Sequence, residues 1–300
     1  MDIGPQRVPQ VIAEIGCNHM GEMELASELI RTAAQFCKVD AVKFQKRNPR
    51  ELLTPEQYDA PHPEPRNSFG RTYGEHREYL ELSIEEHAEL KALCDSLGVT
   101  YSCSAWDLTS AKALHQLAPD WIKIPSACNT DIEMMTWLCE HFAGGLHVSL
   151  GMTTHAEERV LLDLLAAHGR LQDTVIYACT SGYPVAVDDL CLREITRLVD
   201  AYGSKVQAIG FSGHHLGIAA DIAAITLGAA WIERHFTLDR TSKGTDHAAS
   251  LEPDGMRRLC RDVRNVARAL TFRGSEILEV ERAQRTKLKT PNKPRLVRAA

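Results

Sequence analysis

The sequence has little of several features that define specialised classes of protein. None of its apolar runs approaches the length of a bilayer-spanning helix, and residues 1–7 lack the apolar core of a secretory signal. A formal net charge of −6 leaves no basic excess, which argues against a general nucleic-acid or membrane-surface binder. The nine cysteines include no Cys-x-x-Cys pair and are scattered, as in reduced proteins. These absences predict a soluble cytoplasmic enzyme, with neither nucleic acid nor membrane as a partner.

The chain is rich in apolar runs that alternate with amphipathic stretches. Its 300 residues, 44% of them hydrophobic, suffice for one large core. We expect strands over residues 8–15, 41–45, 100–103, 121–124, 146–150, 174–178, 206–211 and 230–236. We expect helices over residues 22–36, 84–97, 108–117, 132–142, 155–168, 190–202, 218–227 and 252–270. This alternation predicts an α/β fold, a single-domain (β/α)8 TIM barrel over residues 1–272. A Rossmann-type sheet is the rival, but no Gly-x-Gly-x-x-Gly follows the first strand.

Two segments fall outside this alternation. Residues 46–83 separate the second strand from its helix and contain many prolines, glycines and charges. A connection of this length is usually functional or disordered, and we favour a loop that covers the substrate. Residues 273–300 form a basic tail without a core pattern. Because the rest of the chain is acidic, we expect a solvated or subunit-packing tail rather than a nucleic-acid arm.

Strand parity places several polar side chains inside the predicted barrel. Successive residues of a strand face opposite sides, so Glu233 and His235 share one face while their apolar neighbours pack on the helices. The same test puts Lys43 and Gln45 on the inner face of the second strand. Lys123 faces away from the isoleucines on either side of it. In such a barrel, side chains at the carboxyl ends of the strands perform the chemistry.

The two inward lysines, Lys43 and Lys123, need negative charge, because a buried ammonium group is costly alone. Internal carboxylates such as Glu14 and Glu233 could supply some of it. A phosphate or carboxylate ligand could supply the rest, and we favour this second interpretation. A single serine after a strand is more often a turn or cap residue. Five that converge on one rim make an anion cradle plausible: Ser104, Ser126, Ser149, Ser181 and Ser212.

Two histidines follow the last two predicted strands, which are neighbours in a barrel. Neutral imidazoles of His214 and His235 could share a divalent cation with waters and substrate oxygens. A hydrogen-bonded structural role is the alternative. Because His19, His215 and His247 are also available, the residues alone do not define the ligand set. They support an anion-binding, metal-assisted barrel enzyme without naming its reaction.

Seven stretches of the sequence, in order, resemble the sialic acid synthase (N-acetylneuraminate synthase) family over residues 8–272. Each stretch is weak alone, but the combination is specific. They are Val11-Ile12-Ala13-Glu14-Ile15-Gly16-Cys17-Asn18-His19-Met20-Gly21, Val42-Lys43-Phe44-Gln45, Thr72-Tyr73-Gly74-Glu75-His76-Arg77, Ile122-Lys123-Ile124-Pro125-Ser126-Ala127, Ser149-Leu150-Gly151-Met152, Ile232-Glu233-Arg234-His235 and Asp246-His247-Ala248-Ala249-Ser250-Leu251-Glu252-Pro253.

The resemblance implies a barrel enzyme that condenses phosphoenolpyruvate with the open-chain aldehyde of a sugar. The products would be a 3-deoxy-2-ulosonic acid and phosphate. Carried over by position, the residues that bind phosphoenolpyruvate would be Lys43, Ser104, Lys123, Ser126, Ser149, Ser181 and Ser212. Those that contact the acceptor sugar would be Glu14, Gln45, Tyr183 and Asp246, with Tyr73 closing over it from the long loop. His214 and His235 would hold a divalent metal, Mn2+ with Mg2+ or Co2+ as alternatives.

The chemistry agrees with these implied roles. Carbon 3 of the enol attacks the aldehyde, carbon 2 takes water, and the tetrahedral intermediate expels phosphate. A carboxylate near carbon 2 can accept the proton of that water, and Glu14 and Glu233 are both candidates. Lys43 and Lys123 balance the phosphate and carboxylate charges. We expect a homo-oligomer, a dimer or tetramer.

Some features depart from the family pattern. Ser104 stands where threonine is common, Ser181 where asparagine occurs, and Gly213 where many members have aspartate. Many members continue into an antifreeze-like domain that senses the N-acyl group of the acceptor across a swapped dimer, and the present sequence ends at Ala300 without it. A non-acylated or phosphorylated acceptor is therefore the main alternative to an N-acetylmannosamine-like sugar. A degenerate barrel without activity is less favoured, since the lysines and histidines are present.

Overall fold

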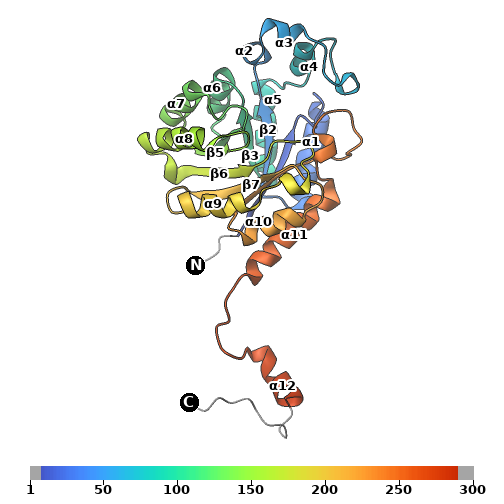
Figure 1. Ribbon diagram of the computed structural model, residues 1–300. Helices are drawn as coiled ribbons and strands as arrows, with labels where there is room; N and C mark the ends of the chain where they lie inside the picture. The colour runs from blue at the N-terminus through green and yellow to red at the C-terminus, as the bar shows by residue number, and fades with distance from the viewer. Residues whose placement is uncertain (1–7, 290–300) are drawn as a thin grey trace.

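The computed structural model describes residues 8–289, and its eight parallel strands close into one barrel in chain order (Figure 1). The (β/α)8 prediction is confirmed. Strand bounds lie within two residues of the expected ones. The strands are β1 (Gln10–Gly16), β2 (Ala41–Lys46), β3 (Thr100–Ala105), β4 (Trp121–Ile124), β5 (Gly145–Ser149), β6 (Thr174–Cys179), β7 (Ala208–Gly213) and β8 (Trp231–His235).

Helices surround this barrel as the amphipathic pattern predicts. Several begin at side-chain caps, and the Ser83 cap of α5 and the Thr154 cap of α8 form capping boxes with Glu86 and Glu157. The surrounding helices are α1 (Met23–Arg31), α5 (Ile84–Leu97), α6 (Leu108–Gln116), α7 (Ile132–His141), α8 (His155–Ala167), α9 (Arg193–Tyr202), α10 (Ala219–Thr226) and α11 (Pro253–Ala269). The helix expected over residues 22–36 is α1 followed by a π-helical segment, Thr32–Cys37.

The barrel interior has an apolar floor and a charged upper layer. The floor consists of Ile12, Ala41, Trp121, Val175 and Tyr177, a cluster separate from the main core between strands and helices. Along β1 the next inward residue after Ile12 is Glu14, so the same parity that fills the floor brings charged groups to the carboxyl ends. The site therefore rests on a packed, apolar base.

The long segment between β2 and α5 is folded into short helices. It carries α2 (Pro49–Leu52), α3 (Pro55–Asp59), the 3-10 turn η2 (Pro65–Asn67) and α4 (Tyr73–Tyr79), grouped at the top of Figure 1. Backbone and ring contacts hold it together: Tyr73 donates its N–H to the Ala60 carbonyl at 2.7 Å, and Gly74 lies against the Tyr58 ring. A side chain at Gly74 would collide with that ring.

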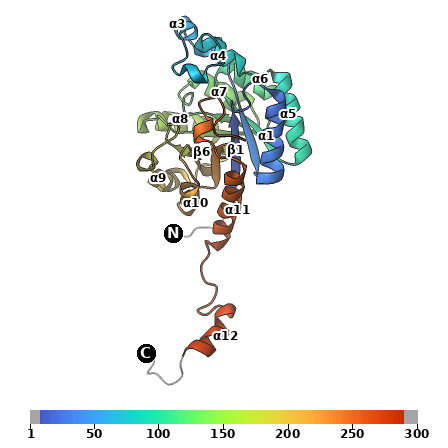
Figure 2. The same ribbon diagram turned by 90° about the vertical axis from the view of Figure 1, so that its right-hand side faces the viewer.

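Beyond α11 the chain leaves the barrel and forms α12 (Glu279–Leu288). Both views show this helix apart from the barrel (Figures 1 and 2), and none of its residues is buried. The basic residues Lys293, Arg295 and Arg298 of the expected tail lie outside the described residues. Within residues 8–289 no helix is both long and apolar enough to cross a membrane.

Candidate active site

A buried network of two carboxylates and two lysines occupies the upper layer of the barrel. Lys43 Nζ lies 2.6 Å from a Glu14 oxygen and 3.8 Å from a Glu233 oxygen, and Lys123 Nζ lies 3.0 Å from that same Glu233 oxygen. Glu14 is level in register with Lys43 on one side and His235 on the other. Each of these side chains is less than a tenth exposed. As strand parity predicted, the side chains of Lys43, Lys123, Glu233 and His235 lie inside the barrel.

The two carboxylates of this network differ in proton affinity. Burial raises the pKa of Glu14 to about 7, against the attraction of Lys43. Burial would also raise the pKa of Glu233, but Lys123 and Lys43 outweigh it and hold that pKa well below its usual range. Glu233 therefore stays ionised, whereas Glu14 can gain or lose a proton near neutral pH.

A cavity of about 290 Å³ opens directly above the network. Lys43 donates to Ser104 at 2.7 Å, and Ser212 donates to Glu233 at 3.0 Å. Lys123 Nζ also lies 3.4 Å from the centre of the Tyr177 ring below it. Every hydroxyl expected in the anion cradle lines this cavity: Ser104, Ser126, Ser149, Ser181 and Ser212. The space is therefore bounded by ammonium groups on its floor and hydroxyls around its rim.

Gly151, just after β5, keeps part of this rim open. A Cβ atom there would lie 2.6 Å from the Ser181 hydroxyl and 2.7 Å from the Ser126 hydroxyl. Its backbone N–H donates to Ser126 at 3.0 Å, which orients that hydroxyl. Glycine leaves the two hydroxyls free to face a ligand.

His214 and His235 stand together at one wall of the cavity, with ring centres 5.4 Å apart. His214 donates from Nδ1 to the Thr180 carbonyl at 3.0 Å, so in the neutral tautomer that makes this bond Nε2 is the acceptor nitrogen. Burial lowers the pKa of His235, which keeps its imidazole neutral. Among residues 8–289 no group of three or more His, Cys, Asp or Glu side chains could hold a metal. A divalent ion held by this pair would take its remaining ligands from waters or a substrate.

The other histidines considered from sequence make structural contacts. His19 accepts at Nδ1 from the Gly21 N–H at 3.1 Å, and burial lowers its pKa to about 4. His215 lies 3.3 Å from Asp221, and His247 hydrogen-bonds Thr237 at 2.8 Å. These three contacts hold loop or helix positions around the barrel rim.

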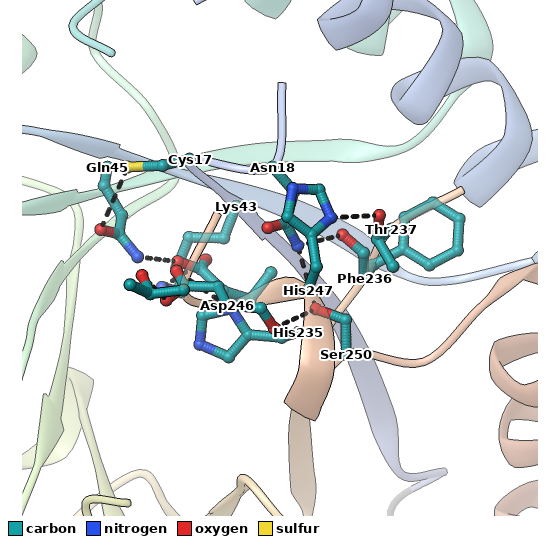
Figure 3. Close-up of polar contacts among 12 residues, drawn as sticks. Cys17, Asn18, Lys43, Gln45, His235, Phe236, Thr237, Asp246, His247 and Ser250 are labelled. Atoms are coloured by element: carbon teal, nitrogen blue, oxygen red, sulfur yellow. Dashed lines mark hydrogen bonds and ion pairs between the residues drawn. The ribbon is translucent and has the colours of Figure 1, made fainter. Parts of the chain in front are cut away.

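A second cavity, of about 230 Å³, continues the first toward the long segment and shares Gln45, Trp106, Tyr183 and His235 with it. Asp246 enters it from the loop after β8, and its carboxylate lies 3.7 Å from His235 Nδ1, beside Gln45 and Lys43 (Figure 3). The Asn18 side-chain amide stabilises that loop by donating hydrogen bonds to the Phe236 carbonyl and the Ser250 hydroxyl, each at 2.9 Å (Figure 3).

Of the residues predicted to contact an acceptor, Glu14, Gln45, Tyr183 and Asp246 line the two cavities. Tyr73 is not among the residues that line them. Its hydroxyl accepts two hydrogen bonds from Arg77, at 2.8 and 3.0 Å, and Arg77 itself lines the second cavity. The long segment also contributes Phe69, His76 and Leu80 to that lining.

Sequence reasoning missed several residues of these cavities. Arg47 has the parity of Lys43 and Gln45, so extending the second strand by two residues would have predicted it. Cys179 is the last residue of β6, and Trp106 directly follows β3. Both are uncharged, so the search for buried charges in the sequence did not identify them. For Arg77 no periodic signal exists, because it belongs to α4 of the long segment.

Comparison with known proteins identifies the family. The NeuB family model matches residues 29–274. This chain belongs to the NeuB family. The match confirms the resemblance inferred from the motifs, and it makes the chain an enzyme, a phosphoenolpyruvate-dependent synthase of carbohydrate biosynthesis.

Curated relatives are named for different products. The chain is 35% identical to N-acetylneuraminate-9-phosphate synthase of Mus musculus, over 93% of its own length and 76% of the relative's. It is 34% identical to N,N'-diacetyllegionaminic acid synthase of Legionella pneumophila, over 87% and 72%. Among solved structures, a sialic acid synthetase from Leptospira borgpetersenii superposes with a TM-score of 0.79 at 24% identity, covering 94% of this chain and 93% of that one. The structural likeness supports the barrel fold of this NeuB-family chain.

Proposed function

We propose that this NeuB-family enzyme condenses phosphoenolpyruvate with the open-chain aldehyde of an N-acetylmannosamine-like sugar. The products are a sialic-acid-type 3-deoxy-2-ulosonic acid and inorganic phosphate. The observation that carries the proposal is the first cavity, where two buried lysines and five serine hydroxyls meet two histidines. Such a lining suits a small, multiply charged anion placed beside a Lewis acid.

In this proposal the floor and rim of the first cavity bind phosphoenolpyruvate. Lys43 and Lys123 offset the charges of its phosphate and carboxylate, and the serine hydroxyls donate to their oxygens. Both lysines are already paired with glutamates, so they are held in place before the ligand arrives. Preorganised charge of this kind stabilises a transition state without reorganisation during the reaction.

His214 and His235 are the proposed metal ligands. A divalent ion held there, Mn2+ with Mg2+ or Co2+ as alternatives, would polarise the aldehyde oxygen. Asp246 and Gln45 at the join of the two cavities would accept and donate hydrogen bonds to the hydroxyls of the sugar. The aldehyde carbon is then directed toward carbon 3 of phosphoenolpyruvate, where the new carbon–carbon bond forms.

Glu14 is the proposed acceptor of the proton from water. After carbon 3 bonds to the aldehyde carbon, the aldehyde oxygen takes up a proton and becomes a hydroxyl group. Water adds to carbon 2 and one of its protons passes to the carboxylate. The carbon–oxygen bond to phosphate then breaks, and the second water proton leaves as the keto group forms. The raised pKa of Glu14 suits proton transfer near neutral pH, whereas Glu233 stays ionised between the lysines. Glu233 would therefore act by holding Lys43 and Lys123.

The test is a phosphate-release assay with phosphoenolpyruvate, Mn2+ and four sugars: N-acetylmannosamine, its 6-phosphate, mannose and arabinose. We expect release with an N-acetylmannosamine-type sugar and its loss after chelation, with recovery when Mn2+ is restored. Release that survives thorough chelation would contradict the roles of His214 and His235. No release with any sugar would favour a degenerate barrel.

We further propose that the enzyme is a cytoplasmic homo-oligomer, a dimer or tetramer. Sedimentation of the purified chain would measure its mass, and fractionation of cells that express it would give its location. A monomer at micromolar concentration, or recovery outside the cytoplasm, would contradict the proposal.

A further inference from the structure

The second cavity contains a buried guanidinium group with no carboxylate partner among the described residues. Arg47 is 7% exposed, and its side chain donates to the Cys17 sulfur at 3.2 Å and to the Gln45 carbonyl oxygen, both neutral acceptors. Its guanidinium carbon lies 3.9 Å from the centre of the Trp106 ring. Burying a charged group is costly unless an opposite charge compensates it. Glu81 and Asp246 attract this guanidinium group, but no ion pair joins it to either carboxylate among residues 8–289.

Of the two carboxylates that attract Arg47, Glu81 is already paired with another residue. Glu81 pairs with Lys46 Nζ at 3.0 Å and accepts the backbone N–H of Arg47 at 2.9 Å. The guanidinium group of Arg47 instead faces the cavity that it lines. In this position Arg47 can bind an anion that enters the cavity.

A second arginine lines the same cavity from the long segment. Arg77 donates both its Nε and Nη2 hydrogens to the Tyr73 hydroxyl, and within residues 8–289 it too has no ion pair. Lys243 lies at the edge, with its ammonium group 4.4 Å from the centre of the Phe69 ring that forms part of the wall. These three cations come from the residue after β2, from α4 and from the loop after β8.

The negative charge of this cavity is smaller than its positive charge. Asp246 is the only acidic residue among its lining residues, and its carboxylate lies 3.7 Å from His235 Nδ1. Arg47 and Arg77 thus share the lining with one carboxylate, and Lys243 adds a third positive charge at the edge. A phosphate monoester, which carries a charge of about −1.5 to −2 at neutral pH, would balance the excess.

Arg47 and Arg77 line the second cavity but not the first, which holds the proposed reacting groups. The first cavity holds Lys43, Lys123 and the histidine pair, and the second continues from Gln45, Tyr183 and His235 toward Arg47 and Arg77. An acceptor whose aldehyde is at His235 therefore extends its opposite end toward the arginines. Guanidinium groups bind phosphate through paired, charge-assisted hydrogen bonds.

We infer that the acceptor of this enzyme is a sugar phosphate, and that Arg47 and Arg77 bind its phosphate at the end opposite to the aldehyde. The inference rests on the proposed condensation and narrows its acceptor to a phosphorylated class. Phosphoenolpyruvate does not compete for this position, because its own anion cradle is the first cavity.

The experiment compares N-acetylmannosamine with its 6-phosphate on the full chain, with phosphoenolpyruvate and Mn2+ held constant. We expect kcat/KM for the phosphorylated sugar to be larger by about 10- to 100-fold, the effect of one or two charge-assisted hydrogen bonds. Arg77→Gln should reduce that ratio toward one, and Arg77→Lys should keep part of it. KM for phosphoenolpyruvate should change little relative to KM for the sugar phosphate.

Arg66→Gln is the matched control, because Arg66 is a surface arginine of the same long segment whose side chain is 84% exposed. It should leave the ratio unchanged. Equal kcat/KM for the two sugars would overturn the inference while leaving the condensation intact. So would an Arg77→Gln effect that is the same for both sugars.

Binding calorimetry with the same two sugars decides the inference even if neither is converted. Tighter binding of the 6-phosphate that weakens in Arg77→Gln supports it, and the absence of that difference contradicts it. A sugar with a carboxylate in place of the phosphate that binds equally well would contradict the assignment to phosphate. Lack of phosphate release with every sugar counts against the condensation alone.

Discussion

Glu14 and Glu233 are the two residues whose chemistry depends most on their surroundings. Both are buried and both contact Lys43, but Glu233 also has Lys123 at 3.0 Å and the Ser212 hydroxyl at 3.0 Å. With these two additional neighbours the pKa of Glu233 is lowered, whereas the pKa of Glu14, which lacks them, is raised. One carboxylate is thus a fixed anion, and the other can exchange a proton.

The pH dependence of kcat tests the role of Glu14. Because the pKa of this carboxyl is raised to about 7, its ionised form becomes the major one only above that pH. We expect kcat to rise with pH through an apparent pKa near 7. Glu14→Gln should remove this limb and lower kcat by about 100- to 10,000-fold, as for loss of a general base. Glu24→Gln, on the exposed face of α1, is the control. An unchanged limb in Glu14→Gln would exclude the assignment.

Lys123→Ala tests the anion cradle. The lysine is fully buried between Glu233 and the Tyr177 ring, so its removal deletes a preorganised positive charge at the floor of the first cavity. We expect kcat to fall by about 100- to 1,000-fold, the range for one electrostatic group in a transition state. Phosphate release measures the rate, and circular dichroism checks the fold. Lys112→Ala, on the exposed face of α6, should be nearly normal. Near-normal condensation by Lys123→Ala would refute the site.

At the scale of elements, β8 and α10 are joined by an ion pair that faces away from the cavity. Arg234 and Asp221 are both 0% exposed, and Arg234 also donates to the carbonyls of Gly217 and His215. Parity places Arg234 on the outer face of β8, between Glu233 and His235. The pair therefore fixes the strand whose inward side chains belong to the site.

Asp221→Ala should strongly destabilise the fold. It leaves the guanidinium group of Arg234 buried without its carboxylate, a change that costs about 3–5 kcal/mol in the free energy of unfolding. Thermal unfolding should show a Tm lower by several degrees. Asp95→Ala is the control, since Asp95 pairs with Lys91 on the exposed surface of α5. Equal Tm values for the two variants would contradict the importance of the buried pair.

The short helices of the long segment are stabilised by packing against one another rather than by intrinsic helix propensity. Its helices α2 and α3 have only four and five residues, too short to be stable alone, and Tyr58 and Gly74 pack α3 against α4. This packing brings Phe69, His76 and Arg77 to the second cavity. That this segment covers the substrate stays a prediction. Its residues line the second cavity, which is where such a cover would lie.

For the molecule as a whole, α12 is not packed into the hydrophobic core of the barrel. No residue of α12 is buried, and Arg273 and Glu281 pair within the same terminal segment at 3.0 Å. Removal of residues 274–300 should therefore change the Tm of the barrel by no more than about 2 °C. Differential scanning calorimetry measures this, and sedimentation on the same samples shows the oligomer. A much lower Tm or a smaller oligomer would show that the tail packs on the barrel or on another copy.

Much of the fold was predictable because its signals are local. Alternating apolar runs and amphipathic stretches define the eight strands and helices, and Ser83 and Thr154 indicate where two helices begin. Boundary errors have local causes too: β7 begins at Ala208 because Val206 still closes the turn after α9, where its N–H donates to Tyr202. Short helices of residues 46–83 were not predictable, since their stability comes from contacts with one another.

The sequence by itself determined the closed barrel and which residues face its interior, because the twofold repeat of a strand places Lys43, Lys123, Glu233 and His235 together at one end. Only the tertiary structure decided how these charges divide their roles. A pKa depends on every neighbour around the closed ring, and Glu14 and Glu233 differ by neighbours from other strands. The same holds for Arg47 and Arg77, whose approach to one cavity depends on how the long segment folds over the rim.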